Sequence, residues 1–413
     1  MTHRPTTSLS DAQLRDALTR QPDASRLGEE LDLVVASVRR TRQVGFGNRP
    51  WILLAAAVVL TILLLALALA GTSRLPRSPS ALIAFGVGWD IVLVQGDGSD
   101  ARRLTDDPET EWDPTWSRDG TRLAYWSDDP LPPGDTCGAF CLGAPRRLVV
   151  VDPRVGPMRP SVLTTVSNSA AWRISWSPDS RRLVVGDVEN GIRVLVIVDA
   201  HTGVRSRLGT ATLDGWDGAW SPDARHIVFA HGRVDPSKRS LEVIDADGAN
   251  LRQLTTIRSR GAGFATPAWS PDGARIAFAS ETTGTDRFQR DIWTVGLDGS
   301  PEVDRSNDPA DELGPTWSPD GSRLAWLREI APGTSRFHLV VADATGAAVR
   351  VLPQVVANTP AVWSQDGTRV LAVRLSDDGR PDRLVAIDVQ SGAALVVSNG
   401  VPDDVGSWQP PQR

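Results

Sequence analysis

The sequence has few of the residues from which metal centres and nucleophilic active sites are usually built. Its 413 residues include only two cysteines, five histidines, one lysine and one tyrosine. It contains no His-x-x-x-His or His-Glu-x-x-His zinc motif, no Gly-x-Ser-x-Gly nucleophile motif and no glycine-rich phosphate loop. The net charge of −6 argues against nucleic acid as a partner, because such partners require a basic surface. These absences make an enzyme the less favoured class.

Tryptophan, by contrast, is abundant and recurs in one phrase: Trp-Ser, a turn of the Ser-Pro-Asp-Gly kind, then a basic residue that opens an apolar strand. The copies begin at Trp116, Trp176, Trp220, Trp269, Trp317 and Trp363, with a degenerate copy at Trp408. The intervals between them are 60, 44, 49, 48, 46 and 45 residues. A period of about 40–50 residues with strand-like content is typical of a β-propeller, in which each repeat forms a four-stranded blade.

The phrase has a local physical reason. Proline at the second turn position presets φ to about −65°, the aspartate side chain bonds backbone N–H groups ahead of it, and glycine supplies a positive φ. Arg118 and Gln365 replace the proline, and Ser180 and Ala224 replace the glycine, so the turn tolerates variation.

At these residues the chain resembles the TolB-like β-propeller family, whose repeat is also called WD40-like or PD40. The resemblance covers roughly residues 80–410 and rests on turn and packing residues. It therefore implies an all-β propeller fold and little about function. Members of the family include periplasmic interaction proteins and the propeller domains of some peptidases, whose hydrolase domain is not recognised in this sequence.

The ends of the repeat region decide the number of blades. Residues 82–104 contain the second, third and fourth strands of a blade without its Trp-Ser strand, and the strand at Trp408 has no blade after it. Pairing these two pieces closes the ring and removes exposed strand edges. We therefore expect seven four-stranded antiparallel blades over residues 81–413, with six blades, as in the family archetype, as the alternative.

Residues 51–70 form an apolar run that a propeller does not need. No charge occurs between Arg49 and Arg74, and a helix of this length spans about 30 Å, the thickness of the hydrocarbon core of a bilayer. The run predicts a transmembrane helix, followed by a linker over residues 71–80. Because arginines are more numerous before the run than directly after it, we expect residues 1–50 in the cytoplasm and the propeller outside. A cleaved signal peptide ending at Ala68-Leu69-Ala70 is the alternative.

Residues 1–50 are polar and too short to build a substantial core, so we expect a partly helical or disordered segment. The alternative is a docking segment for a cytoplasmic partner, because a short cytoplasmic segment, one span and an external domain resemble the layout of membrane-bound anti-sigma regulators. The segment has no cysteine and its one histidine is His3, which excludes the zinc-binding version of that domain.

Cys137 and Cys141 lie in the insertion that lengthens the first tryptophan interval. A disulfide between them is expected if the propeller is outside the cytoplasm. A metal site would need two further ligands, and none is adjacent in the sequence.

The mouth of the central channel is the candidate binding site. Since the innermost strands carry the Trp-Ser phrase, the residues just before each tryptophan should line one end of the channel. The candidates there are Glu111, Asp113, Arg173, Asp214, Asp217, Asp311, Glu312, Asn358 and Asp404. Converging carboxylates would focus a negative potential and accept a divalent cation such as calcium, a basic peptide loop or a polar ligand. The alternative is that these are solvated loop residues without a ligand.

The sequence therefore predicts a single-pass membrane protein that displays a TolB-like propeller outside the cytoplasm as a non-catalytic binding or scaffold module, with a protein or polar ligand at the channel mouth and no cofactor. One alternative is a transmembrane regulator that couples the propeller to a cytoplasmic partner of residues 1–50. Another is a propeller hydrolase or lyase that uses channel acids and a metal.

Overall fold

A computed structural model of the chain describes residues 81–129, 145–154, 162–167, 173–210, 214–232, 239–258, 266–281, 289–398 and 400–410. Every regular element within these ranges is a β-strand. No helix long and apolar enough to cross a bilayer occurs among these residues. The predicted transmembrane helix at 51–70, the segments before and after it, and Cys137 and Cys141 lie outside the described residues. Residues 77–413 form one compact unit.

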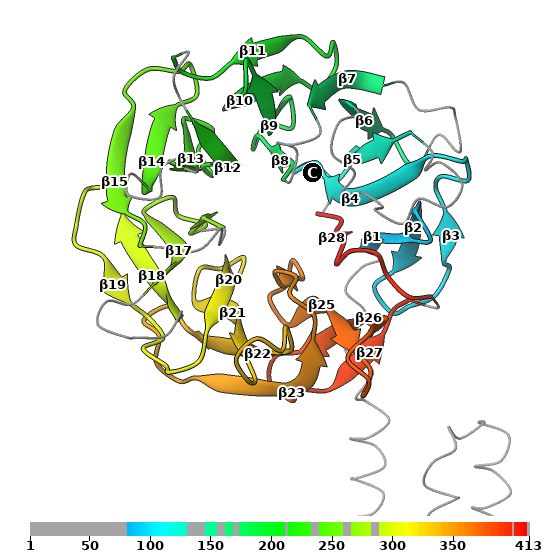
Figure 1. Cartoon of the computed structure of the whole chain (residues 1–413). Coiled ribbons are helices and arrows are strands. Elements are labelled where there is room, and N and C mark those ends of the chain that lie inside the picture. The colour runs from blue at the N-terminus through cyan, green and yellow to red at the C-terminus, as the bar shows by residue number, and fades with distance from the viewer. Residues whose placement is uncertain are drawn as a thin grey trace, which may run out of the picture. The chain divides into compact units, whose positions relative to one another are not determined.

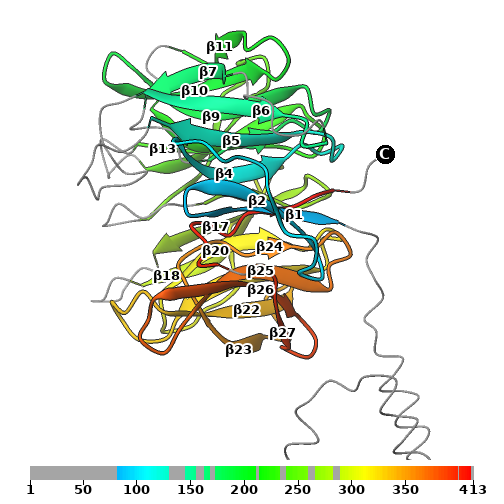
Figure 2. The same ribbon diagram turned by 90° about the vertical axis from the view of Figure 1, so that its right-hand side faces the viewer.

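The strands of this unit form antiparallel sheets placed around a central axis (Figure 1). Five sheets contain four strands each and a sixth contains eight. Seen from the side, the sheets follow one another face to face around the axis (Figure 2). The strands that carry the Trp-Ser phrase, such as β4, β8, β12 and β20, lie nearest the axis, and β3, β7, β11, β15 and β19 lie furthest from it (Figure 1).

The five four-stranded sheets follow the repeats in the sequence. The first consists of β28 (Ser407–Trp408), β1 (Leu82–Val87), β2 (Asp90–Gln95) and β3 (Arg102–Arg103). The second consists of β4 (Thr110–Trp116), β5 (Leu123–Asp128), β6 (Pro145–Val151) and β7 (Val162–Ser167). The third consists of β8 (Ser175–Trp176), β9 (Arg182–Glu189), β10 (Ile192–Asp199) and β11 (Arg205–Arg207). The fourth consists of β12 (Gly215–Trp220), β13 (His226–His231), β14 (Ser240–Asp245) and β15 (Arg252–Thr256). The fifth consists of β16 (Ala268–Trp269), β17 (Arg275–Glu281), β18 (Arg290–Gly296) and β19 (Val303–Asp304).

The eight-stranded sheet contains the last two complete repeats. Its first half consists of β20 (Glu312–Trp317), β21 (Arg323–Glu329), β22 (Phe337–Asp343) and β23 (Arg350–Val356). Its second half consists of β24 (Val362–Trp363), β25 (Arg369–Leu375), β26 (Pro381–Asp388) and β27 (Ala394–Val396). The two halves are joined by one pairing, Val356 with Arg374.

The two ends of the repeat region close the ring. Strand β28 pairs with β1, with Trp408 opposite Ile83 and Ser407 opposite Ala84. The C-terminal strand thus supplies the innermost strand that residues 82–104 lack, and both lose an exposed edge. This confirms the pairing predicted from the sequence.

The serine and aspartate of the phrase hold the turn together. The Ser318 hydroxyl donates to Asp320 at 2.6 Å and accepts the Arg323 N–H at 2.9 Å. The same serine-to-aspartate bond recurs at Ser117–Asp119, Ser177–Asp179, Ser221–Asp223, Ser270–Asp272 and Ser364–Asp366. The serine and the aspartate therefore recur in every complete repeat because their side chains form the hydrogen bonds of the turn.

The tryptophan and the basic residue lock neighbouring repeats together. The Trp317 indole N–H donates to the Ala268 carbonyl of the preceding repeat at 3.2 Å. Equivalent bonds run from Trp176 to Thr115, Trp269 to Ala219, Trp363 to Thr316 and Trp408 to Val362. The guanidinium of one repeat also lies over the tryptophan of the next, in the pairs Arg122–Trp176, Arg182–Trp220, Arg275–Trp317 and Arg323–Trp363.

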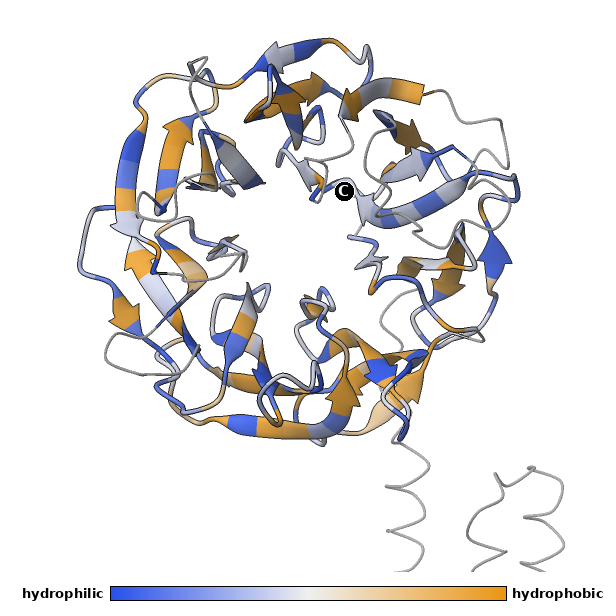
Figure 3. Ribbon diagram, in the orientation of Figure 1, coloured by the Kyte–Doolittle hydropathy of each residue, from blue (hydrophilic) through white to orange (hydrophobic). Residues whose placement is uncertain are grey.

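Apolar side chains fill the space between adjacent sheets, where Phe85, Phe229, Phe278 and Trp326 are almost completely buried. Figure 3 shows apolar residues gathered in the middle strands and polar residues in the turns and in outer strands such as β3. Because each sheet is covered on both faces by its neighbours, its middle strands are mostly apolar. This packing leaves the axis as a channel lined by the innermost strands.

Candidate functional site

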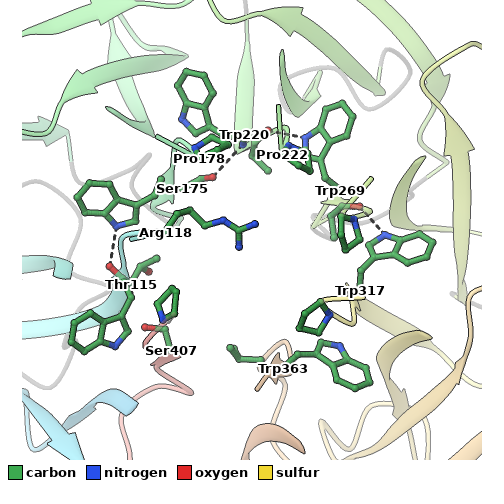
Figure 4. A pocket seen from close by; sticks show the side chains of 18 of the residues that line it. Thr115, Arg118, Ser175, Pro178, Trp220, Pro222, Trp269, Trp317, Trp363 and Ser407 are labelled. Carbon is green, nitrogen blue, oxygen red and sulfur yellow. Dashed lines mark hydrogen bonds between the residues drawn. The ribbon is translucent and has the colours of Figure 1, made fainter. Parts of the chain in front are cut away.

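The end of the channel formed by the Trp-Ser turns is a cavity of about 810 Å³, which we call the funnel. Its wall consists of the tryptophans of the phrase and the residues on either side of them, as Figure 4 shows. Prolines at the second turn position line it at Pro178, Pro222, Pro271, Pro319 and Pro410. The wall is about equally polar and apolar, and its charged residues are Arg118, Asp119, Arg173 and Asp179. Concave surfaces that combine apolar side chains with a few polar groups are typical of binding sites in folded proteins.

Arg118 departs from the proline that most of these turns have at their second position. It occupies the position at which four of the complete repeats have proline, and its guanidinium points into the opening (Figure 4). The side chain is exposed. Sequence reasoning noted the departure from proline but did not assign Arg118 to the site. A charged side chain in place of the proline was the available signal.

Arg173 also lines the funnel, at the start of the third repeat. It precedes β8, and its Nη1 donates to the Pro267 carbonyl next to β16 at 2.9 Å. The side chain therefore reaches past the intervening β12 sheet. Burial lowers the pKa of the Arg173 guanidinium, and the nearby Asp217 and Asp113 oppose this shift. The arginine thus lies in the field of two carboxylates.

A β-bulge places those two carboxylates. The pairing register of β4 shifts between Trp112 and Thr115, around Asp113, and that of β12 shifts around Asp217 in the same way. Both aspartates have φ of 55°, the left-handed region that usually requires glycine. In β20 the equivalent bulge contains Gly314, with φ of 65°. Non-glycine residues in such a strained conformation often occur at functional sites.

Asp404 completes this group. Its carboxylate accepts the Gly86 N–H at 3.0 Å and the Asp113 N–H at 2.9 Å. Burial raises the pKa of Asp404 to about 6. Burial also raises the pKa of Asp113 to about 7, the charge of Asp404 adds to this rise, and Arg173 opposes it. Near neutral pH this group therefore carries less negative charge than its three aspartates would as ionised groups.

The structure does not bring the other sequence candidates to this group. Glu111 and Glu312 are completely buried, and neither lines the funnel. Their position, five residues before the tryptophan, lies within a strand, where side chains alternate between the two faces of the sheet. These two glutamates therefore face the neighbouring sheet.

The remaining candidates are also dispersed. Asp214 is buried just before β12, and Asn358 is exposed after β23. Asp311 forms an ion pair with Arg290 at 2.6 Å. Of the nine candidates, four come together in the structure: Asp113, Arg173, Asp217 and Asp404. The other five lie elsewhere, so the nine side chains do not form one acidic mouth.

Comparison with known proteins supports the architecture. Residues 257–413 match the TolB beta propeller domain family (PD40). TolB from Acinetobacter baumannii is similar in structure, with a TM-score of 0.50 and 15% identity over 80% of this chain and 81% of that protein. This chain has a TolB-like β-propeller fold. The resemblance predicted from the tryptophan phrases is thereby confirmed at the level of the fold.

Enzymes share the TolB-like fold. An oligogalacturonate lyase from Vibrio parahaemolyticus has a TM-score of 0.52 and 16% identity over 76% of this chain and 84% of the lyase. A puromycin-hydrolyzing peptidase from Mycobacterium tuberculosis has a TM-score of 0.53 and 18% identity over 78% of this chain and 53% of the peptidase. At these identities the similarity shows the fold alone.

A relative with higher sequence identity is an uncharacterized protein from Agrobacterium fabrum, 33% identical over 135 residues. That alignment covers 32% of this chain and 42% of the relative, so the chain spans less than half the length of this protein.

Proposed function

We propose that this protein is a membrane-anchored, extracytoplasmic binding or scaffold module that holds a protein segment or polar ligand in its funnel. The observation that carries the proposal is the funnel itself, an 810 Å³ cavity with rigid walls into which Arg118 points and which Arg173 also lines. The two aspartates of the same wall, Asp119 and Asp179, accept hydrogen bonds from the serines of their own turns. The two guanidinium groups therefore suit a ligand that carries a carboxylate or another anionic group. This changes the expected ligand from a cationic group to an anionic or polar one.

The closed ring supports this proposal. Because β28 pairs with β1 and five of the phrase tryptophans bond the preceding repeats, the wall is held in place before a ligand arrives, which lowers the entropic cost of binding. We count the eight-stranded sheet as two blades, because one residue pair joins its halves, and so assign seven blades.

The membrane anchor in this proposal rests on the apolar run at residues 51–70, and the orientation rests on the arginines that precede it. With residues 1–50 in the cytoplasm, the propeller faces the outside of the membrane. Protease protection in sealed vesicles tests this orientation: the propeller should be digested only from its own side.

Affinity capture of the full chain from its own membranes tests the binding role. The informative variant is Arg118→Gln, because Gln365 occupies the equivalent turn position and shows that the fold accommodates glutamine there. We expect a partner that the wild type retains and this variant loses. Arg252→Gln, on the exposed outer strand β15, is the matched control and should retain it. Identical partners for all three proteins would contradict a funnel site.

The regulator alternative makes a separate prediction. If residues 1–50 hold a cytoplasmic partner, deletion of residues 1–48 should release that partner while the partner that depends on Arg118 stays bound. If the deletion changes nothing in the captured set, the regulator role is wrong.

A further inference from the structure

Three carboxylates gather outside the funnel, where the first two sheets meet. Asp107 and Glu109 lie between β3 and β4, and Glu111 lies on β4. Each offers a carboxylate oxygen, and these oxygens lie within 4.8 Å of one another. None of the three lines the funnel.

One oxygen of this cluster is buried without a hydrogen-bond donor. The Glu111 side chain is 0% exposed. Its Oε2 accepts the Thr105 hydroxyl at 2.9 Å, whereas its Oε1 has no partner. A buried carboxylate oxygen without a partner is costly, so its surroundings call for an explanation.

The repeat that ends at Trp317 shows a corresponding arrangement elsewhere in the ring, in which a cation lies among the carboxylates. Thr105, Asp107, Glu111 and Trp116 correspond to Ser306, Asp308, Glu312 and Trp317, each 201 residues later. Glu312 is also completely buried, and its Oε1 accepts the Trp326 indole N–H at 2.8 Å and the Arg328 Nε–H at 2.7 Å. Its Oε2, like Glu111 Oε1, has no hydrogen-bond partner, so the two clusters differ in the cation and not in the number of bonded oxygens.

Arg328 is the cation that holds this second cluster together. Besides its bond to Glu312, its Nη1 lies 3.1 Å from Asp308. One guanidinium therefore bridges the two carboxylates that correspond to Glu111 and Asp107.

The first cluster has lost that cation. The position of Arg328 is occupied by Ser127, opposite Glu111 in the strand pairing, and that of Trp326 by Tyr125. The Ser127 hydroxyl bonds Glu109 at 2.7 Å, and Arg147 pairs with Glu109 at 2.8 Å. Among the described residues, no cationic group forms an ion pair with Asp107 or Glu111.

We infer that the Asp107–Glu109–Glu111 cluster binds a calcium ion, which takes the place that Arg328 holds in the later repeat. Three carboxylates offset by one arginine leave two negative charges, which a divalent cation balances. All three oxygens lie within 4.8 Å of one another, which is no further apart than two ligand oxygens on opposite sides of a calcium ion. Asp107 is exposed, which leaves room for water ligands, and calcium accepts such irregular oxygen shells more readily than magnesium.

Calcium titration of the full chain in detergent, after removal of metal with EGTA, tests the inference. Calorimetry should detect one ion more per wild-type chain than per Glu111→Gln chain. At calcium a hundredfold above Kd, the wild-type melting midpoint should rise by roughly 3–8 °C, and that of Glu111→Gln should not. Asp107→Asn, at an exposed position that does not threaten folding, should weaken calcium affinity at least tenfold.

Two variants make the test specific to this cluster. Glu312→Gln removes the corresponding glutamate of the later repeat and should leave the calcium stoichiometry unchanged. Ser127→Arg restores the guanidinium of that repeat and should abolish calcium binding at this cluster while the chain remains folded. If the wild type binds no calcium at millimolar concentration, or if Glu111→Gln and Asp107→Asn bind it as the wild type does, the inference is wrong, and a proton shared between Glu111 and Asp107 takes the place of the ion.

Discussion

The Arg275 guanidinium lies 4.8 Å from the centroid of the Trp317 ring, across the boundary between two repeats. The arginine opens the second strand of its own repeat, and the tryptophan ends the first strand of the next. The tryptophan in turn bonds the Ala268 carbonyl of the earlier repeat. A motif that looks local in the sequence therefore joins neighbouring sheets.

Replacing Arg275 with alanine should lower the free energy of unfolding by about 1–2 kcal/mol, because a partly desolvated cation–π contact and its packing are lost. Arg275→Lys should recover part of this, since it keeps the charge without the planar stacking. Arg252→Ala, on the exposed strand β15, should change stability by less than about 0.5 kcal/mol. Urea unfolding followed by tryptophan fluorescence measures all three, and equal effects of the Arg275 and Arg252 variants would argue against the contact.

The turn aspartates should make the ring sensitive to acid. Hydrogen bonds from the Ser318 hydroxyl and from Ser322 lower the pKa of Asp320 to about 2, below its ordinary value of 3.8. Its stabilising contribution is complete above about pH 4 and is lost as the pH falls through 2. The pKa values of Asp119, Asp179, Asp223 and Asp272 are lowered as well.

We therefore expect the urea midpoint of the wild type to fall steeply between about pH 4 and pH 2. Asp320→Asn should be less stable than the wild type at pH 7 and should lose less stability over that acid range. Parallel pH profiles for the two proteins would show that the turn bonds do not favour the ionised aspartate.

Asp404 has the opposite pH dependence. Burial raises its pKa to about 6, so the folded state binds a proton more tightly than the unfolded state does. Its contribution to stability is therefore largest below about pH 4 and falls as the pH rises through 6. An asparagine there can accept only one of the N–H groups of Gly86 and Asp113, which costs about 1–2 kcal/mol.

For Asp404→Asn this predicts a clear deficit in stability at pH 4 and a smaller deficit at pH 7, measured by urea unfolding at each pH. A deficit that grows as the pH rises would mean that the ionised carboxylate is favoured in the folded ring.

The left-handed conformation of Asp217 gives a further prediction. Asp217→Gly and Asp217→Ala both remove the carboxylate near Arg173, but only glycine relieves the strain at a φ of 55°. Asp217→Ala keeps the strain and should be about 1 kcal/mol less stable than the glycine variant. Thermal melting of the two variants checks this, and an alanine variant that matches the glycine variant would show that the bulge is unstrained.

Much of the fold can be read from the sequence because the tryptophan phrase repeats a local turn with strict requirements. The pairing of β28 with β1 follows from counting which strand each end lacks. The site is harder to predict, because it depends on the direction of side chains. Glu111 and Asp113 are two residues apart, yet across the bulge between Trp112 and Thr115 one is buried between the sheets and the other lies near Arg173 and Asp404.

The contact between the basic residue and the next tryptophan was also beyond sequence reasoning. The basic residue after each turn was noted as part of the phrase, but its position over the next tryptophan depends on the angle between neighbouring sheets. Likewise, Arg118 was treated as a tolerated departure from proline, although its position in the ring directs it into the funnel (Figure 4).

Photo-crosslinking in intact membranes tests the central claim that the funnel is the binding surface. A photoreactive residue at Pro222, on the funnel wall, should give a discrete adduct with a partner, and the adduct should disappear when Arg118→Gln is added. The same residue at Val204, which is exposed in the turn between β10 and β11, should give none. If Pro222 and Val204 give the same adducts, or if the Pro222 adduct persists in the Arg118→Gln background, the funnel is not the binding surface.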